Sequence, residues 1–305
     1  MNERELLEAA GRLPKSIEPP RDLWPGIEAR LGRSRRWYWV GLAAAAVIAL
    51  VMVIPKGNAW TVTWLAGSGP ATLRVGQSVE TDDSSRAVIT VGHIGHVELR
   101  PRTRIQLVTA RADDHRLALA HGAIEAKVDT VPRIFFVETP VGTAIDLGCA
   151  YTLEMDSLGN GLLHVTAGMV EFTGTGGVAR VPMGAMVVTR AGAGAGIPYV
   201  EDASDALKRA LAASDVRAIL AAARPDDAIS LWHLLQRVDS GQRAAVYDRV
   251  SALVPPPPGV TRAAALTLDR TVLDGYWNHI HRILFRKVTL RGVRDIDPRT
   301  GTRVR

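Results

Sequence analysis

Residues 151–165 read Tyr-Thr-Leu-Glu-Met-Asp-Ser-Leu-Gly-Asn-Gly-Leu-Leu-His-Val and predict a β-hairpin. Apolar and polar side chains alternate in Tyr151–Met155, as they do in a strand with one buried face. The turn Asp156–Gly161 contains an Asn-Gly pair, whose glycine adopts a positive φ at little steric cost. Leu162–Val165 then returns as the second strand. Because an isolated hairpin is at best marginally stable, further strands must cover its apolar face.

Short runs rich in Val, Ile, Leu and Thr recur on both sides of this hairpin. No helical periodicity separates them, so residues 60–200 are predicted to form an all-β domain of packed antiparallel or solenoid-like short strands. The other predicted strands are Ala87–Val91, Val97–Leu99, Ile105–Val108, Arg116–Leu119, Ile124–Val128, Phe135–Glu138, Met169–Thr173 and Met186–Thr189. The glycine-rich run Ala191–Gly196 has the composition of a linker. It lacks the Lys-Ser/Thr pair and the strand-to-helix context of a phosphate-binding loop.

From residue 203 the apolar side chains recur at helical spacing. The pattern covers Asp205–Ala223, Asp226–Val238 and Gln242–Leu253. Pro255–Pro258 ends the third segment, and Thr261 is expected to cap a fourth helix that continues through Trp277. We therefore predict a small α-helical C-terminal module over residues 203–285.

The basic character of the chain is confined to its two ends. The formal net charge is +6, yet residues 1–36 carry eight basic and six acidic groups and residues 282–305 carry eight and two, while the remainder carries 21 and 23. Direct binding to nucleic acid is not expected, because it needs basic groups clustered on one folded face. Residues 286–305 are expected to be a basic tail or a hairpin with strands at 293–296 and 302–304.

The run Trp37–Ile54 contains no charged residue. As a helix rising about 1.5 Å per residue it would span roughly 27 Å, close to the hydrocarbon thickness of a bilayer. A buried core helix rarely stays apolar for so long, and a signal peptide usually has a shorter apolar run that begins earlier. We predict a retained transmembrane helix over 37–54, with a cleaved signal peptide as the alternative. Trp60 and Trp64 are expected to lie at the far membrane interface.

Charged residues beside this run set its orientation. Arg33, Arg35 and Arg36 precede it, whereas only Lys56 follows it closely. The positive-inside rule therefore places the N-terminus in the cytoplasm. In a bacterium the chain would be a single-pass inner-membrane protein, with a cytoplasmic tail over residues 1–36 and a periplasmic body.

The tail carries two short amphipathic patterns interrupted by prolines. Neither can bury a core alone, so the tail is either disordered or docks on a partner. The candidate partner-binding residues are Leu6, Leu7, Trp24, Ile27 and Leu31.

Four segments of the β region share a pattern with a known family. Residues 135–148 read Phe-Phe-Val-Glu-Thr-Pro-Val-Gly-Thr-Ala-Ile-Asp-Leu-Gly, Val75–Thr81 precedes them, Ser85–Ile89 is followed by Val97–Leu99, and His164–Glu171 reads strand, glycine, strand. Together, over roughly residues 65–190, these segments resemble the FecR domain, the periplasmic sensor domain of membrane-anchored anti-sigma regulators. The signature positions expected to have structural roles are Thr139, Pro140, Gly142, Asp146, Gly148 and Gly168.

The resemblance implies a function in signalling across the inner membrane. The outer domain would receive an envelope signal, from an envelope protein, and the tail would hold a sigma factor or another cytoplasmic regulator. The alternative is a membrane-anchored periplasmic scaffold or protein-binding module with no sigma partner.

The sequence does not predict an enzyme. It has no Ser-His-Asp order with a nucleophile elbow, and its eight histidines are scattered. His279 and His281 are two apart on a predicted helix and would not share a face, so no metal or other cofactor is expected. Cys149 is expected to be a small buried apolar residue, with a reactive or dimer-forming thiol as the alternative.

Overall fold

The computed structural model describes residues 59–129 and 131–294, with side chains described as far as residue 284. The predicted transmembrane helix, the candidate partner-binding residues of the tail and the predicted segment at 302–304 lie outside the described residues. Among the described residues, no helix is long and apolar enough to span a membrane. The chain divides into two units, Met1–Lys56 and Gly57–Arg305. The second unit contains all the elements below.

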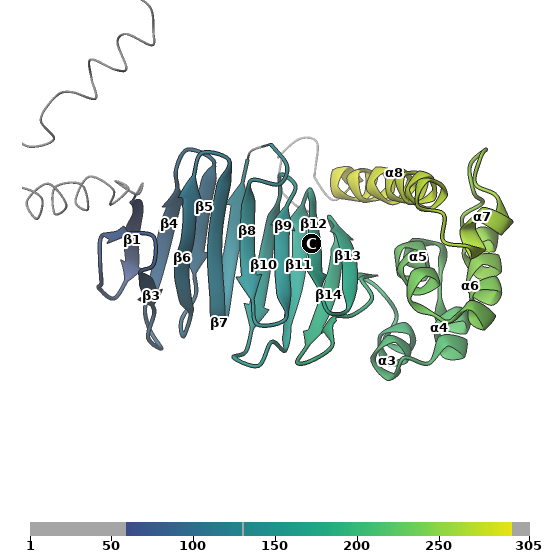
Figure 1. The fold of residues 1–305 in the computed structure, drawn as a ribbon, viewed down its shortest axis with the longest axis horizontal. Coiled ribbons are helices and arrows are strands. Elements are labelled where there is room, and N and C mark those ends of the chain that lie inside the picture. Colours follow the sequence, from purple (N-terminus) through teal and green to yellow (C-terminus); the bar gives the residue numbers. More distant parts are fainter. Residues whose placement is uncertain (1–58, 130, 295–305) are drawn as a thin grey trace, which may run out of the picture. The chain divides into compact units, whose positions relative to one another are not determined.

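Residues 60–200 form an all-β domain of 16 strands, as the alternation of side chains predicted (Figure 1). The strands are β1 (Trp60–Ala66), β2 (Thr72–Leu73), β3 (Ser78–Glu80), β4 (Arg86–Val91), β5 (Gly95–Leu99), β6 (Arg104–Arg111), β7 (Asp114–Val128), β8 (Phe135–Thr139), β9 (Gly142–Asp146), β10 (Ala150–Met155), β11 (Gly161–Ala167), β12 (Met169–Gly174), β13 (Gly177–Pro182), β14 (Ala185–Arg190), β15 (Gly194–Ala195) and β16 (Tyr199–Val200).

The long strand β7 belongs to two sheets. Its N-terminal half pairs with β6 and β8, whereas its C-terminal half, from Gly122 onward, pairs with β5 and β10. The first sheet has the order β2-β1-β4-β5-β7-β10-β11-β14, with β15 and β16 both on β14, and the second has the order β3-β6-β7-β8-β9-β12-β13. Pairing between the described strands is antiparallel except between β7 and β8.

The buried side chains of both sheets form one apolar core. Along β4, for example, Ala87, Ile89 and Val91 are buried, and the residues between them are not. This alternation lets two sheets pack face to face while their outer faces stay polar.

The helical module predicted after the β domain is also present. Its elements are α3 (Asp205–Ala213), α4 (Val216–Ala222), the 3-10 turn η1 (Pro225–Asp227), α5 (Ala228–Arg237), α6 (Ser240–Leu253), α7 (Arg262–Leu266) and α8 (Arg270–Arg294). The side chains of Ser204, Asp215, Asp239 and Thr261 accept backbone hydrogen bonds at the starts of α3, α4, α6 and α7, as N-cap residues do.

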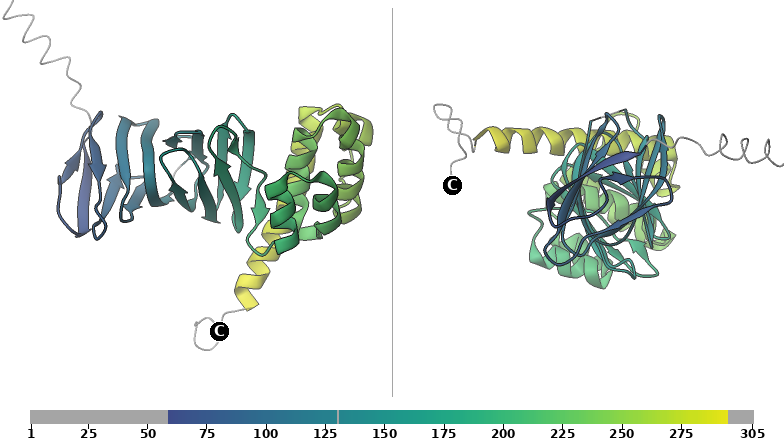
Figure 2. Two further views of the ribbon diagram at one scale, coloured as in Figure 1. Left: turned by 90° about the horizontal axis from the view of Figure 1, so that it is seen from below. Right: turned by 90° about the vertical axis from the view of Figure 1, so that its left-hand side faces the viewer.

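Helix α5 is buried on almost all sides. Its first eight residues, Ala228–Leu235, are all buried. It contacts α6, α8 and strand β16, and the views in Figure 2 show the helices gathered beside the last strands of the sheets. A helix that is apolar all round requires such a position.

Two expectations for the ends of the β domain were wrong. Trp60 lies in the core, 2% exposed, because Trp60, Val62 and Trp64 alternate with exposed threonines along β1. It is therefore no membrane-interface residue. The glycine-rich run expected to be a linker contains β15, whose two residues are buried and pair with β14.

The helical segments also differ in their bounds. The segment expected to form one helix after Thr261 is broken at Leu268, whose φ of 58° separates α7 from α8. Helix α8 continues past residue 285 to Arg294, so the strand expected at 293–296 begins inside a helix. Proline is the strongest interruption of a helix, and the first one downstream is Pro298.

Candidate functional site

The first half of the signature forms the β8–β9 hairpin. The Thr139 hydroxyl donates to the Gly142 carbonyl at 2.7 Å and closes the turn through Pro140. The Gly142 backbone approaches β12 so closely that a Cβ there would lie 2.3 Å from the carbonyl oxygen of Thr173. These contacts fix a turn and a strand pairing.

The second half of the signature places a buried carboxyl group beside a thiol. Asp146 is 1% exposed, and its Oδ1 accepts from the Gly148 backbone N–H at 2.6 Å. The Cys149 thiol lies close to the same carboxyl group. Burial raises the pKa of Asp146 to about 6, although the neighbouring Cys149 and Gly148 groups oppose the change. Burial, followed by the nearby Asp146 charge, also raises the pKa of the Cys149 thiol. The thiol is therefore buried and protonated, which is unfavourable for a nucleophile.

Gly168, between β11 and β12, packs directly against this turn. Its φ is +69°, and a Cβ there would lie 2.1 Å from the carbonyl oxygen of Gly148. The structure thus brings Asp146, Gly148 and Gly168 together, and it places Thr139, Pro140 and Gly142 at the hairpin at the other end of β9. It gives no positions for Leu6, Leu7, Trp24, Ile27 and Leu31, which lie outside the described residues.

A second cluster, which the sequence did not indicate, joins β13 to the helices through Arg180. The Arg180 guanidinium lies 2.8 Å from Asp274 Oδ1 on α8 and 3.4 Å from Glu171 Oε1 on β12. Glu171 also pairs with Arg133. The Arg180 backbone N–H donates to His233 Nε2 on α5 at 2.9 Å. A single strand residue therefore contacts β12, α5 and α8.

Two tryptophans of the helices complete this cluster. The guanidinium carbon of Arg180 lies 5.4 Å from the ring centre of Trp232 and 5.8 Å from that of Trp277, within the range of cation–π attraction. The two rings are 4.8 Å apart, and Trp232 Nε1 donates to the Leu273 carbonyl at 2.9 Å. The two rings thus pack against each other, and the indole N–H of Trp232 has an acceptor.

His233 is held neutral between two backbone groups. Nδ1 lies 2.8 Å from the Ile229 carbonyl, to which it donates, while Nε2 accepts from Arg180. The residue is 1% exposed, and burial lowers its pKa to about 3. Protonating Nε2 would place an N–H against the Arg180 N–H, so the fold favours the neutral ring.

Further contacts show that the module is a buttress on the β domain. Ser230 donates to the Pro198 carbonyl at 2.7 Å, and the Arg237 guanidinium donates to the carbonyls of Ala195 at 2.9 Å and Val178 at 3.4 Å. The sequence could have indicated part of this junction, because a helix apolar on every face must be covered on every face. Nothing local points to Arg180 or Asp274, which are 94 positions apart.

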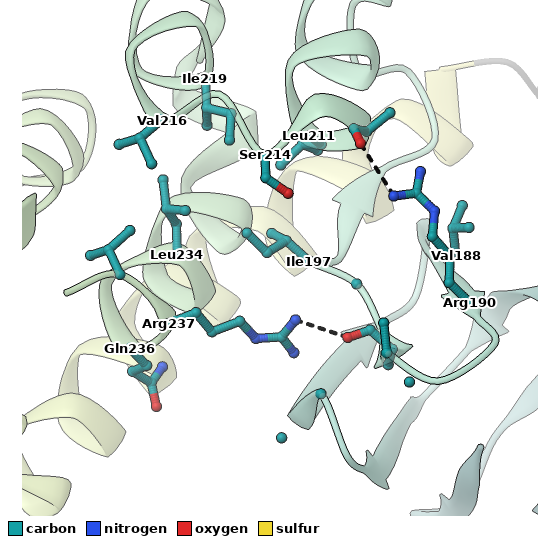
Figure 3. Close-up of a pocket in the computed structure, with 18 of the residues that line it drawn as sticks. Val188, Arg190, Ile197, Leu211, Ser214, Val216, Ile219, Leu234, Gln236 and Arg237 are labelled. Carbon is teal, nitrogen blue, oxygen red and sulfur yellow. Dashed lines mark hydrogen bonds between the residues drawn. The ribbon is translucent and has the colours of Figure 1, made fainter.

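A pocket of about 860 Å³ that is partly open to solvent lies at the junction, between α3, α4, α5 and the β14–β15 hairpin (Figure 3). Both apolar and cationic side chains line it. Among residues 59–129 and 131–294 there is no group of three or more His, Cys, Asp or Glu residues that could hold a metal ion.

Comparison with known proteins supports the family resemblance. Residues 77–171, which include the signature, match the family model described as FecR protein. Two crystal structures of a candidate anti-sigma factor from Parabacteroides distasonis ATCC 8503 are similar, each at 17% identity, with TM-scores of 0.35 and 0.37. The matches cover 39% and 44% of this chain but only 57% and 64% of those chains. A search of curated proteins gives no match. The chain thus contains a FecR domain at residues 77–171, as the signature predicted.

Proposed function

We propose that the chain is a FecR-type regulator that acts by binding other proteins rather than by catalysis. The FecR domain at residues 77–171 carries this proposal. In this proposal Trp37–Ile54 crosses the bacterial inner membrane, residues 1–36 are cytoplasmic, and the described body is periplasmic. An envelope protein delivers the signal to the body.

The tail is the proposed output of the regulator. Apolar side chains at Leu6, Leu7, Trp24, Ile27 and Leu31 would bury their surface against a sigma factor. Short amphipathic segments bind in this way when a partner supplies the groove that they lack, and buried Trp side chains often dominate such interfaces.

The junction described above suits a receiving domain. Arg180, His233 and Ser230 connect strands to helices, so a partner that binds either part would meet one connected surface. This supports the proposal that the module belongs to the signal-receiving body.

The proposed topology can be tested with a reporter fusion. Alkaline phosphatase fused after Arg305 should be active in cells, because the enzyme requires export, and deletion of Trp37–Ile54 should abolish that activity. A tag before Met1 should remain on the membrane-bound protein. Loss of that tag in the mature protein would show a cleaved signal peptide instead.

The proposed partner can be tested by pull-down from membranes of the native host. The full chain should recover a sigma factor, and Trp24→Ala should lose it, whereas Ser16→Ala, a polar position in the same tail, should not. Replacing residues 1–36 by an unrelated basic segment should abolish regulation. Unchanged function after that replacement would favour the scaffold alternative.

A further inference from the structure

The pocket at the junction is large enough for a small ligand. Its volume of about 860 Å³ lies within the usual range for small-molecule sites, roughly 300–1,000 Å³. Its walls come from α3, α4 and α5 on one side and from β14 and β15 on the other.

One part of the wall is apolar. In Figure 3 the side chains of Val216, Ile219 and Leu234 gather on one side of the pocket and Arg190 lies on the other, with Ile197 between them. Leu211 also lines the space. Ile219 and Leu234 are buried, so the exposed apolar area comes from Ile197, Leu211 and Val216, which are partly exposed. That area favours a hydrocarbon group, since contact removes it from water.

The pocket also contains three cations that no carboxylate neutralises. Arg190 donates to the Ala212 carbonyl at 3.2 Å, Lys208 to the Glu201 carbonyl at 3.3 Å, and Arg237 to the Ala195 carbonyl at 2.9 Å. These acceptors are backbone carbonyls, and none of the ion pairs within the described part of the chain includes any of the three.

The neighbouring acidic groups already have other partners. Asp239 lines the pocket, but its Oδ1 accepts from the Gln242 backbone N–H at 3.1 Å as the cap of α6. Asp274 and Asp227, elsewhere in the module, pair with Arg180 and Arg224.

Arg237 gains most from an added anion. Its side chain is partly buried, and that burial lowers its pKa because the charged form loses hydration. A guanidinium has five donors, and it prefers to meet a planar anion with two of them. A carboxylate in the pocket would restore part of the lost solvation.

The glycine-rich loop does not offer a phosphate cradle. A cradle needs free backbone N–H groups that converge on the anion. Here the Ala193 N–H donates to Arg190 O at 3.1 Å, and the Gly196 N–H donates to Val188 O at 2.8 Å. The cations and the apolar wall therefore favour a carboxylate with a hydrocarbon chain over a phosphate.

We propose that this pocket binds an amphiphilic carboxylate of the fatty-acid type. The carboxylate contacts Arg190 and Arg237, and the hydrocarbon chain lies against Ile197, Leu211 and Val216. This site is independent of the sigma-factor partner proposed above.

Equilibrium dialysis with radiolabelled octanoate tests the proposal. The full chain is used in lipid nanodiscs, and empty nanodiscs supply the blank. We expect saturable binding of one octanoate per chain, with no comparable binding of octylammonium, which has the same chain and the opposite charge. No saturable binding above the blank, or equal binding of the two probes, would overturn the proposal.

Three variants locate the site. Arg190→Gln and Arg237→Gln should each weaken octanoate binding about tenfold, the usual effect of losing a hydrogen bond to a charged group. Arg217→Gln removes an exposed cation of α4 that does not line the pocket, and it should bind like the wild type. Because Arg190 is exposed, its replacement should leave the fold intact. Equal binding by Arg190→Gln, Arg237→Gln and the wild type would contradict the assignment.

Discussion

Acidification should weaken the junction between sheet and helices through His233. The ring is buried, its Nε2 accepts from the Arg180 N–H, and burial lowers its pKa to about 3. The unfolded chain therefore binds a proton at a higher pH than the folded chain does. The stability that neutral His233 contributes is complete above the ordinary histidine pKa of 6.5, and it is lost as the pH falls from there toward about 3.

The magnitude follows from this difference in pKa. Each pH unit below 6.5 costs about 1.4 kcal/mol of unfolding free energy until the folded pKa is reached. At about pH 5 the loss should be about 2 kcal/mol, and its upper limit is about 5 kcal/mol. His233→Gln keeps an acceptor near the Nε2 position but cannot be protonated in this range, so the variant should not show this loss.

Urea denaturation of the full chain at about pH 7 and about pH 5 measures the effect. The fall in unfolding free energy should be about 2 kcal/mol larger for the wild type than for His233→Gln, because all other titrating groups cancel in that difference. His96→Gln, at an exposed position of the β4–β5 hairpin, should behave like the wild type. An equal fall in the wild type and in His233→Gln would show that His233 does not cause the loss.

Asp146 should make the unfolding free energy depend on pH in the opposite direction, because its pKa in the folded chain is raised to about 6. Its protonated form stabilises the fold at low pH, and that contribution is lost as the pH rises through about 6. Asp146→Asn should raise the unfolding free energy near pH 7 by up to about 3 kcal/mol and change it little near pH 4. The same effect of the substitution at both pH values would contradict this. Gly168→Ala should destabilise the fold by at least about 2 kcal/mol more than Gly177→Ala, because both glycines have a positive φ but only a Cβ at position 168 would meet backbone atoms. Equal midpoints of thermal unfolding for the two variants would count against the close contact between Gly168 and the Gly148 carbonyl oxygen. Arg180→Met should cost about 2 kcal/mol, the usual value of a hydrogen bond to a charged group, and it should speed amide hydrogen exchange in α5 and α8 more than in β4. Uniform exchange changes would argue against a local junction.

The strands could be predicted because their information is local. Alternation along β4, β10 and β11 requires only neighbouring residues, and the turn between β10 and β11 fixes one pairing. The expected role of the Asn-Gly pair was wrong, because the glycine with a positive φ in this turn is Gly159, at 96°, whereas Gly161 already lies in β11. The same rule would have identified β1, but the position of Trp60 near an apolar run favoured a membrane interface instead. Tertiary context decided between the two interpretations.

The junction could not be predicted because its contacts join distant positions. The sequence around Arg180 does not distinguish it from other arginines, because its contacts with Asp274 and His233 form only in the folded chain. The glycine-rich run likewise has the composition of a linker, yet its pairing with β14 makes it a wall of the pocket. Composition describes the flexibility of an isolated segment, whereas pairing depends on the rest of the chain.

The most direct test of the proposed regulator is a cross-link from its tail in living cells. A photoreactive amino acid replaces Ile27 in the full chain, and the products formed on illumination are identified by mass spectrometry. We expect a cross-link to a sigma factor, which disappears when Trp24→Ala is added and persists when Ser16→Ala is added. Cross-links that contain no sigma factor, or that are unchanged by Trp24→Ala, would contradict it.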